Sequence, residues 1–278
     1  MENSTNPLAK YTRQPKLFID LPSKGNAYPS GALDKVEELE VYSMTANDEI
    51  AIKTPDGLFS GKATMGVIQN CVPSIKDANF ITNRDLDYIL AAIRIASYGD
   101  SISLTKVCES CENEDTFAFP LQQLLDHLTA AELVYETTVN EFKFKIRPLY
   151  YKEIVSNQQE SVKLRRHLNQ ILSKLEDANE RAEQIDLIYE QINEQTKNVI
   201  CSVVTEVTTP DGTSETNHLF IKDFILNNES DFYNTIQDLY AKNAKALEIP
   251  AATVECSNCN KEQSIQPNLD YSSFFSKR

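Results

Sequence analysis

The sequence predicts an α+β fold, in which a small mixed core carries a four-cysteine, zinc-ribbon-like module and a long helical hairpin insertion. Two Cys-x-x-Cys pairs lie far apart in the 278-residue chain. Short β-prone runs alternate with amphipathic segments over the first 150 residues. Residues 152–206 contain no Gly or Pro and are rich in Glu, Gln, Lys and Leu, which is typical of long helices.

Residues 1–14 are polar and have no periodicity, so we expect a flexible N-terminal tail. Residues 15–150 predict the α+β core, and the segment 83–98 is its clearest helix, because apolar residues recur on one stripe and Gly99 follows. The other elements expected in this core are strands at 16–22 and 36–44, a helix capped by Thr45 and Asp48, helical spacing at 65–72, a short helix after Pro120, and a hairpin at 133–139 and 141–146.

Residues 151–207 predict a helical hairpin. Two apolar stripes at helical spacing are separated by the polar stretch 176–183, which would be either a bend between two helices or the exposed middle of one rod. We expect the bend, with the two helices antiparallel. Residues 208–278 then predict a turn at 209–214, a helix at 230–246 and strands that return to the core.

The cysteine pairs are Cys108 with Cys111 and Cys256 with Cys259, and each is flanked by β-prone residues, as in the turn of a hairpin. A tetrahedral zinc ion accepts four Cys sulfurs, and a two-residue spacer lets both thiolates of a pair reach the same metal. We therefore expect the four cysteines to share one structural Zn²⁺, which would join the C-terminal segment to the core and close a long loop.

Other arrangements of these cysteines stay open, because the pairs of a contiguous zinc ribbon are usually separated by only about 15–20 residues. The thiols could be free, could form local disulfides, or could join a pair from another subunit. A thioredoxin-like redox motif fits poorly, because the neighbouring Glu residues would raise a thiol pKa. The isolated Cys71 and Cys201 are interpreted as small buried hydrophobic residues.

The charge balance favours protein partners. With 27 basic and 41 acidic residues, the chain has a net charge of −14, which repels nucleic acid and anionic membrane surfaces. No apolar run approaches the roughly 20 residues of a membrane span, and the first residues do not resemble a signal peptide. We expect folding in a cytoplasm.

Enzymatic activity is not expected, and no residue is predicted to be catalytic. His127, His167 and His218 are isolated in the sequence, and the seven glycines form no phosphate-binding motif. A metal ion with four thiolate ligands also has no open position to activate water. The same reasoning predicts no small-molecule substrate.

Several motifs together suggest a family. They are Leu21-Pro-Ser-Lys-Gly-Asn-Ala-Tyr-Pro, Glu40-Val-Tyr-Ser-Met-Thr-Ala-Asn-Asp-Glu-Ile, the helix from Asn83 to Asp100, and Cys108-x-x-Cys111. Their order and spacing over roughly residues 15–125 resemble the T4-like bacteriophage baseplate hub assembly proteins, and Arg94-Ile-Ala-Ser-Tyr-Gly is the most specific part. The long helical region carries no matching motif.

The resemblance implies a non-enzymatic structural or assembly component of the central hub of a contractile-tail baseplate. Its implied partners are other hub proteins or the tape-measure protein, and its implied location is the host cytoplasm during assembly and then the virion tail. The alternative is a zinc-ribbon adaptor or nucleic-acid-associated protein of a cellular complex. Acidic neighbours of both cysteine pairs disfavour it, namely Glu109, Glu112, Glu114, Asp115 and Glu255.

Two further interpretations concern single side chains. Tyr28 could anchor a partner, since tyrosine combines contact area with a polar tip, or it could pack back on the core, which we favour. Arg94 and Tyr98 are one helical turn apart and are interpreted as a structural pair rather than a contact site.

Overall fold

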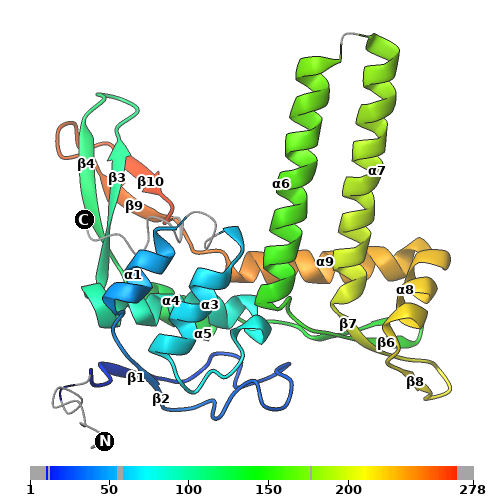
Figure 1. Ribbon diagram of the computed structural model, residues 1–278, viewed down its shortest axis with the longest axis horizontal. Helices are drawn as coiled ribbons and strands as arrows, with labels where there is room; N and C mark the ends of the chain where they lie inside the picture. The colour runs from blue at the N-terminus through cyan, green and yellow to red at the C-terminus, as the bar shows by residue number, and fades with distance from the viewer. Residues whose placement is uncertain (1–10, 12, 55–58, 176, 268–278) are drawn as a thin grey trace, which may run out of the picture. The chain divides into compact units, whose positions relative to one another are not determined.

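The computed structural model describes residues 11, 13–54, 59–175 and 177–267. It confirms the α+β class, because helices combine with small antiparallel sheets (Figure 1). The four cysteines of the two pairs lie in one cluster. The chain divides into two compact units, residues 1–129 with 249–278 and residues 130–248. Among the described helices, none combines the length and the apolar character needed to cross a membrane.

The first unit is discontinuous in sequence, since the chain leaves it after Thr129 and returns at Ile249. Its described elements are β1 (Leu17–Ile19), β2 (Leu39–Val41), α1 (Ala46–Ile52), α3 (Lys62–Cys71), the 3₁₀ helix η2 (Ala78–Phe80), α4 (Asn83–Tyr98), β3 (Ser101–Val107), β4 (Glu114–Pro120), α5 (Leu121–Ala130, ending at the boundary), β9 (Ala252–Glu255) and β10 (Glu262–Ile265). The strands form three antiparallel pairs, β1 with β2, β3 with β4, and β9 with β10.

Local sequence signals explain where helices of the first unit begin and end. The backbone N–H of Asp48 donates to the Thr45 hydroxyl at 3.3 Å, and the Asp48 carboxylate accepts from the Thr45 N–H at 2.7 Å, so the predicted capping box is confirmed. Helix α4 ends at Gly99, whose φ of 102° lies in the region that favours glycine.

Helix α4 buries a long face in the core of this unit. Ile89 and Ile93 are fully buried. Arg84, near its start, donates from Nε to the Leu128 carbonyl at 2.8 Å and from Nη2 to the Thr129 carbonyl at 2.9 Å. These bonds satisfy two carbonyl groups at the end of α5, which have no partner within their own helix.

Most of the predicted N-terminal tail, residues 1–10 and 12, lies outside the described residues. Arg13 is described and is bound to the first unit. Its guanidinium donates to Asn70 Oδ1 at 2.7 Å and to the Ser43 carbonyl, and it stacks over the Tyr42 ring at 5.3 Å. The sequence Pro55-Asp-Gly57, which would end the helix that begins at Thr45, also falls outside the described residues, as does the aromatic tail at 271–275.

The second unit is a four-stranded antiparallel sheet with four helices among its described residues. Its elements are β5 (Glu136–Val139), β6 (Phe142–Ile146), α6 (Tyr151–Lys174), α7 (Ala178–Ser202), β7 (Val204–Thr208), β8 (Ser214–Glu215), α8 (His218–Asn227) and α9 (Ser230–Leu247). The strand order is β5-β6-β7-β8. The tight β5–β6 turn uses Asn140 and Glu141 at φ 46° and 69°.

One sequence expectation about this unit was wrong. Helix was expected up to about residue 206, but α7 ends at Ser202, and β7 pairs with β6 across the helical insertion. Four of the five residues in the run Val-Thr-Glu-Val-Thr are β-branched, and Val204 and Val207 are buried. Their packing in the sheet makes this segment a strand, although no Gly or Pro marks the end of the helix before it.

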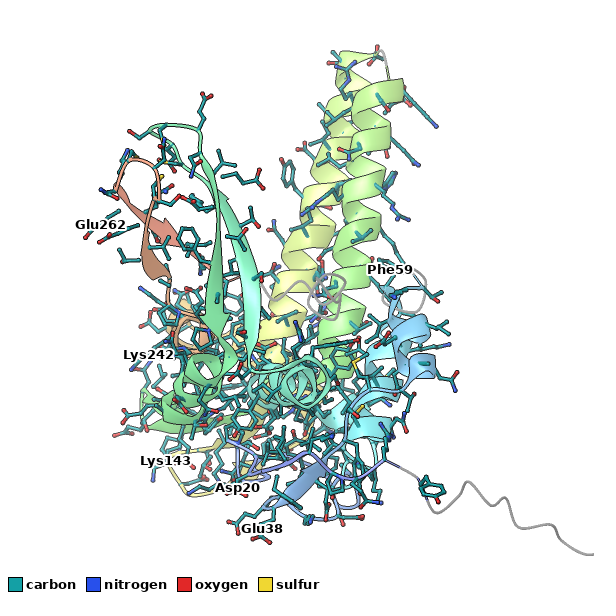
Figure 2. All side chains as sticks on the ribbon, turned by 90° about the vertical axis from the view of Figure 1, so that its left-hand side faces the viewer. Asp20, Glu38, Phe59, Lys143, Lys242 and Glu262 are labelled. Atoms are coloured by element: carbon teal, nitrogen blue, oxygen red, sulfur yellow. The ribbon has the colours of Figure 1, made fainter. Side chains whose placement is uncertain are left out.

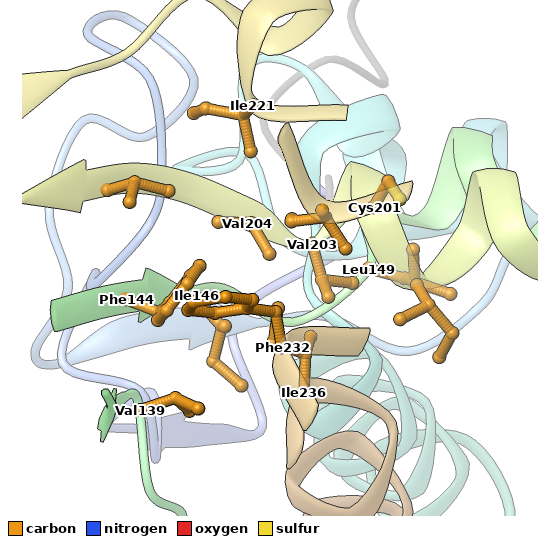
Figure 3. Packing of buried hydrophobic residues seen from close by; sticks show 13 residues of the cluster. Val139, Phe144, Ile146, Leu149, Cys201, Val203, Val204, Ile221, Phe232 and Ile236 are labelled. Carbon is orange, nitrogen blue, oxygen red and sulfur yellow. The ribbon is translucent and has the colours of Figure 1, made fainter. Parts of the chain in front are cut away.

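The core of the second unit lies between its sheet and helices α8 and α9 (Figure 3). Phe144 and Ile236 are fully buried, and Phe232 is 4% exposed. Phe232 also meets Phe142 edge to face, with ring centroids 5.5 Å apart. This apolar cluster anchors the base of the helical insertion, because Ile200 and Cys201 of α7 belong to it.

The insertion is two antiparallel helices, α6 and α7, as expected, and Figure 1 shows them side by side. Leu164, Ile171 and Ile188 form a separate buried cluster between them. The bend follows from sequence, because the Asp177 carboxylate caps α7 by accepting from the N–H groups of Asn179 and Glu180.

The two compact units differ from the four segments predicted from sequence, which are 1–14, 15–150, 151–207 and 208–278. The hairpin β5–β6 pairs with β7 and therefore lies in the second unit. The four-segment division stays a prediction about the chain.

Candidate metal centre

Two β-hairpins of the first unit carry the cysteine pairs in their turns. Strands β3 and β4 pair from Ser101 opposite Pro120 to Val107 opposite Glu114, and the turn 108–113 follows. Strands β9 and β10 pair up to Glu255 opposite Glu262, around the turn 256–261. Figures 1 and 2 show the two hairpins side by side, with Glu262 marking the start of β10 in Figure 2.

The two turns have the same backbone geometry. In the first, the N–H of Cys108 donates to the Asn113 carbonyl at 2.8 Å, and the N–H of Glu112 donates to the Cys108 carbonyl at 2.9 Å. The second turn repeats this pattern with Cys256 N–H to the Lys261 carbonyl at 3.0 Å and Asn260 N–H to the Cys256 carbonyl at 2.9 Å. Glu112 and Asn260 occupy equivalent left-handed positions, at φ 58° and 55°.

The four sulfurs lie at the distances that a single metal ion requires. Cys108 Sγ is 3.7 Å from Cys259 Sγ, Cys111 Sγ is 3.6 Å from Cys256 Sγ, and the four atoms all lie within 4.8 Å of one another. Tetrahedral coordination at a Zn–S distance of about 2.3 Å places sulfurs about 3.8 Å apart. All four cysteines are free thiols, so local disulfides are not formed.

Burial and hydrogen bonding divide the four thiols. Cys108 and Cys256 are buried, whereas Cys259 is exposed. The pKa of Cys111 is lowered to about 6, chiefly by a backbone hydrogen bond at Asn113. The pKa of Cys259 is raised to about 12. A backbone hydrogen bond at Lys261 lowers this pKa, but hydrogen bonds to the neighbouring thiols and desolvation together outweigh it. A metal cation would therefore displace protons from this cluster on binding.

Asp115 of β4 links the two turns directly. Its carboxylate accepts from the Ser257 hydroxyl at 2.5 Å and from the Ser257 N–H at 3.0 Å. Asn113 Nδ2 donates to Asp115 Oδ1 at 2.9 Å and to Ser257 Oγ at 3.2 Å. These bonds lower the pKa of Asp115, with the Ser257 hydroxyl as the largest cause. Such outer contacts hold metal ligands in position.

The sequence does not predict this link, since Asp115 stands out there only as an acidic neighbour of the cysteines. No local signal could have found it, because the bond joins residues 142 positions apart in sequence. The structure brings the four cysteines, Cys108, Cys111, Cys256 and Cys259, together in one cluster.

A family model described as T4 bacteriophage base plate protein matches residues 35–276. The chain belongs to this family. The match covers both cysteine pairs of this baseplate protein and extends the resemblance through the helical insertion. Searches of curated proteins and of solved structures give no match.

The other cysteines and the histidines of this baseplate protein are not part of the four-cysteine cluster. Cys71 and Cys201 are fully buried, as interpreted from their apolar contexts, and desolvation raises the pKa of Cys71 to about 11. His127, His167 and His218 lie on three different helices, α5, α6 and α8.

Proposed function

We propose that this chain is a non-enzymatic structural or assembly component of the central hub of a contractile phage tail baseplate, and that Cys108, Cys111, Cys256 and Cys259 hold a structural Zn²⁺. The observation that carries the proposal is the four-sulfur cluster in a chain of the baseplate family. The function follows from the surfaces that this metal would hold in place, not from chemistry at the metal.

The donor set supports zinc as the ion. Four thiolates in tetrahedral arrangement are the typical ligands of structural zinc, and they leave no position for water or substrate. The ion would connect two turns that are far apart in the chain, since Cys108 is 151 residues from Cys259. Closing so long a loop restricts the unfolded chain, so part of the metal-binding free energy becomes folding free energy.

The proposed partners are other hub proteins or the tape-measure protein of the same phage. The net charge of −14 disfavours phosphate ligands, and two compact units with a two-helix insertion offer several separate protein surfaces. The proposed location is the host cytoplasm during assembly and then the tail baseplate.

Affinity purification from infected cells tests the role. A tagged copy should recover hub or tape-measure proteins as the main co-purifying chains, identified by mass spectrometry, and an untagged infection is the control. Recovery of only sheath, wedge or host proteins would contradict a hub role. Nuclease-sensitive recovery of nucleic acid would favour the adaptor alternative.

A further inference from the structure

One face of the hairpin formed by α6 and α7 exposes large apolar side chains. Leu172 of α6 is 52% exposed, and Tyr189 and Ile192 of α7 are 55% and 36% exposed. Leu168 and Ile185 pack at the edge of the small core between the helices and extend this surface inward. We call these five residues the apolar face. Figure 1 shows both helices extending beyond the sheet of their own unit.

The apolar face lies on one side of the hairpin. Leu172 directly follows the buried Ile171, and Tyr189 directly follows the buried Ile188. Each residue of a helix is turned by about 100° from the one before, and because α6 and α7 are antiparallel, this turn carries Leu172 and Tyr189 to the same side. The other three residues lie three or four positions from these two, on the same stripes. Leu187, directly before Ile188, is carried to the opposite side.

The opposite side of the hairpin already has a neighbour. Glu194, seven residues after Leu187, lies on that side and accepts from Lys222 of α8 at 3.2 Å. Lys222 also donates to Asn198 at 2.5 Å. The apolar face, in contrast, stays exposed, and a monomeric protein rarely leaves a connected apolar surface uncovered. We therefore expect the apolar face to be an interaction surface.

Charges of opposite sign border the apolar face on the two helices. Arg165 and Arg166 of α6 and Glu190 of α7 are exposed, and within the described part of the chain none of them forms an ion pair. Arg166 and Glu190 each come two residues after a buried residue of the small core, so a turn of about 200° points them to the two outer sides of the hairpin. They cannot pair with each other within one chain.

The two arginines lie at about the same height along the hairpin as Glu190. Gln195 Nε2 donates to the Asn157 carbonyl at 2.9 Å, and Arg181 Nε donates to the Leu175 carbonyl at 3.0 Å. Both helices rise about 1.5 Å per residue between these two hydrogen bonds, which fixes the positions that are level with each other to within about one helical turn.

We infer that the apolar face is the docking site for a second copy of this chain, with the two hairpins stacked face to face as a four-helix bundle. A two-fold axis parallel to the helices lays α6 of each copy against α7 of the other, antiparallel and at equal heights. The apolar faces then cover each other, and Arg166 of one copy and Glu190 of the other lie on the same outer wall. This charge complementarity occurs twice, which favours a second copy over an unrelated helix.

The first test compares two leucines of nearly equal exposure on opposite sides of the hairpin. Sedimentation equilibrium of the purified wild-type protein should show a dimer. Leu172→Lys should raise the dimer dissociation constant at least about 10-fold, because each copy would bury an unpaired charge. Leu187→Lys should leave this constant within about 3-fold of wild type. Equal effects of the two substitutions would overturn the inference. So would a wild-type chain that is monomeric at every concentration, which would leave the apolar face to another baseplate protein.

The second test reverses charges on separate chains. Arg166→Glu and Glu190→Arg should each weaken the dimer, because like charges then meet twice. In a mixture of the two variants each copy supplies the charge that the other lacks, so the mixed dimer should be at least about 3-fold tighter than either variant dimer. Native mass spectrometry distinguishes the mixed dimer by its mass. A mixture no tighter than the variants alone would contradict the stacking.

Metal content separates this docking from a metal bridge between chains. Each copy retains its own four cysteines, so the Leu172→Lys monomer should hold as much zinc per chain as the wild-type dimer. Loss of zinc together with loss of the dimer would mean that the chains associate through their cysteines, and would overturn the inference. The result is independent of the hub role, because only the purified chain is measured.

Discussion

The hydroxyl of Tyr28 donates to Asp85 Oδ2 at 2.8 Å, across 57 residues of sequence. Asp85 is fully buried and also accepts from the N–H and hydroxyl of Ser23 and from the hydroxyl of Thr82. Burial and the Asp85 carboxylate together raise the pKa of Tyr28. The loop from Leu21 to Pro29 is therefore fastened to the start of α4, and Tyr28 packs back on the core.

Removing this anchor should destabilise the protein. Tyr28→Phe loses one hydrogen bond to a buried carboxyl group, which costs about 1.5–3 kcal/mol. Asp85→Ala leaves the donors of three side chains without an acceptor, so its free energy of unfolding should fall further. Tyr189→Phe, at a tyrosine that is 55% exposed, is the control and should stay within about 0.5 kcal/mol of wild type. Urea unfolding measures all three, and unchanged stability of Tyr28→Phe would favour a partner-binding role.

The contact between Asp115 and Ser257 should tighten metal binding. Asp115→Ala removes the carboxylate that holds the second turn against the first, and the metal affinity should fall about 10–100-fold. Glu114→Ala removes an exposed carboxylate from the adjacent residue and should change affinity little. Competition with a chromophoric chelator measures both variants. Equal affinities would mean that the cysteines position the metal without this link.

The helical insertion should depend on its own small core. Ile188 is 1% exposed between α6 and α7, so Ile188→Ala should destabilise the hairpin by about 2–5 kcal/mol. Leu187, its neighbour, is 50% exposed, and Leu187→Ala should cost less than about 0.5 kcal/mol. Hydrogen exchange of α6 and α7 amides is the readout. Similar exchange in the two variants would argue against the packing described.

Acid should weaken the start of α6. Arg147 donates to both carboxylate oxygens of Glu153, at 2.6 and 2.8 Å. Burial raises the pKa of Glu153, but the Arg147 bonds and the Tyr150 N–H outweigh this and lower it. The ionised pair therefore stabilises the fold above the unfolded pKa of about 4.3, and this contribution is lost as pH falls through the lower folded pKa.

Glu153→Gln should flatten the pH dependence of stability in that acid range, because its side chain no longer titrates. Glu160→Gln is the control, since Glu160 pairs with Lys163 on the exposed surface of the same helix. Unfolding midpoints measured from pH 7 downward give the comparison. Identical profiles for wild type and Glu153→Gln would show that the pair adds no pH-dependent stability.

Local signals in the sequence were sufficient to predict many of the helices and turns. The capping box at Thr45, the stripe of α4 and the turns around the cysteines each depend on residues close in sequence. The strand β7 escaped prediction, because its partner β6 lies about 60 residues earlier and only tertiary pairing distinguishes it from the end of a helix.

The same limit applies to the sites. Cys-x-x-Cys spacing predicts metal ligands because both thiolates of a pair sit on one turn. The bond from Ser257 to Asp115 spans 142 residues, and no local pattern reveals it.

Zinc content measured by native mass spectrometry tests the central claim most directly, because it reports metal and oligomeric state together. The wild-type protein should carry one zinc ion per chain, and Cys256→Ser and Cys111→Ser should each lose it, whereas Cys71→Ala, at a buried cysteine outside the cluster, should retain it. Two zinc ions per chain, zinc only in species that contain several chains, or zinc retained after Cys256→Ser would contradict a single metal shared by the two turns.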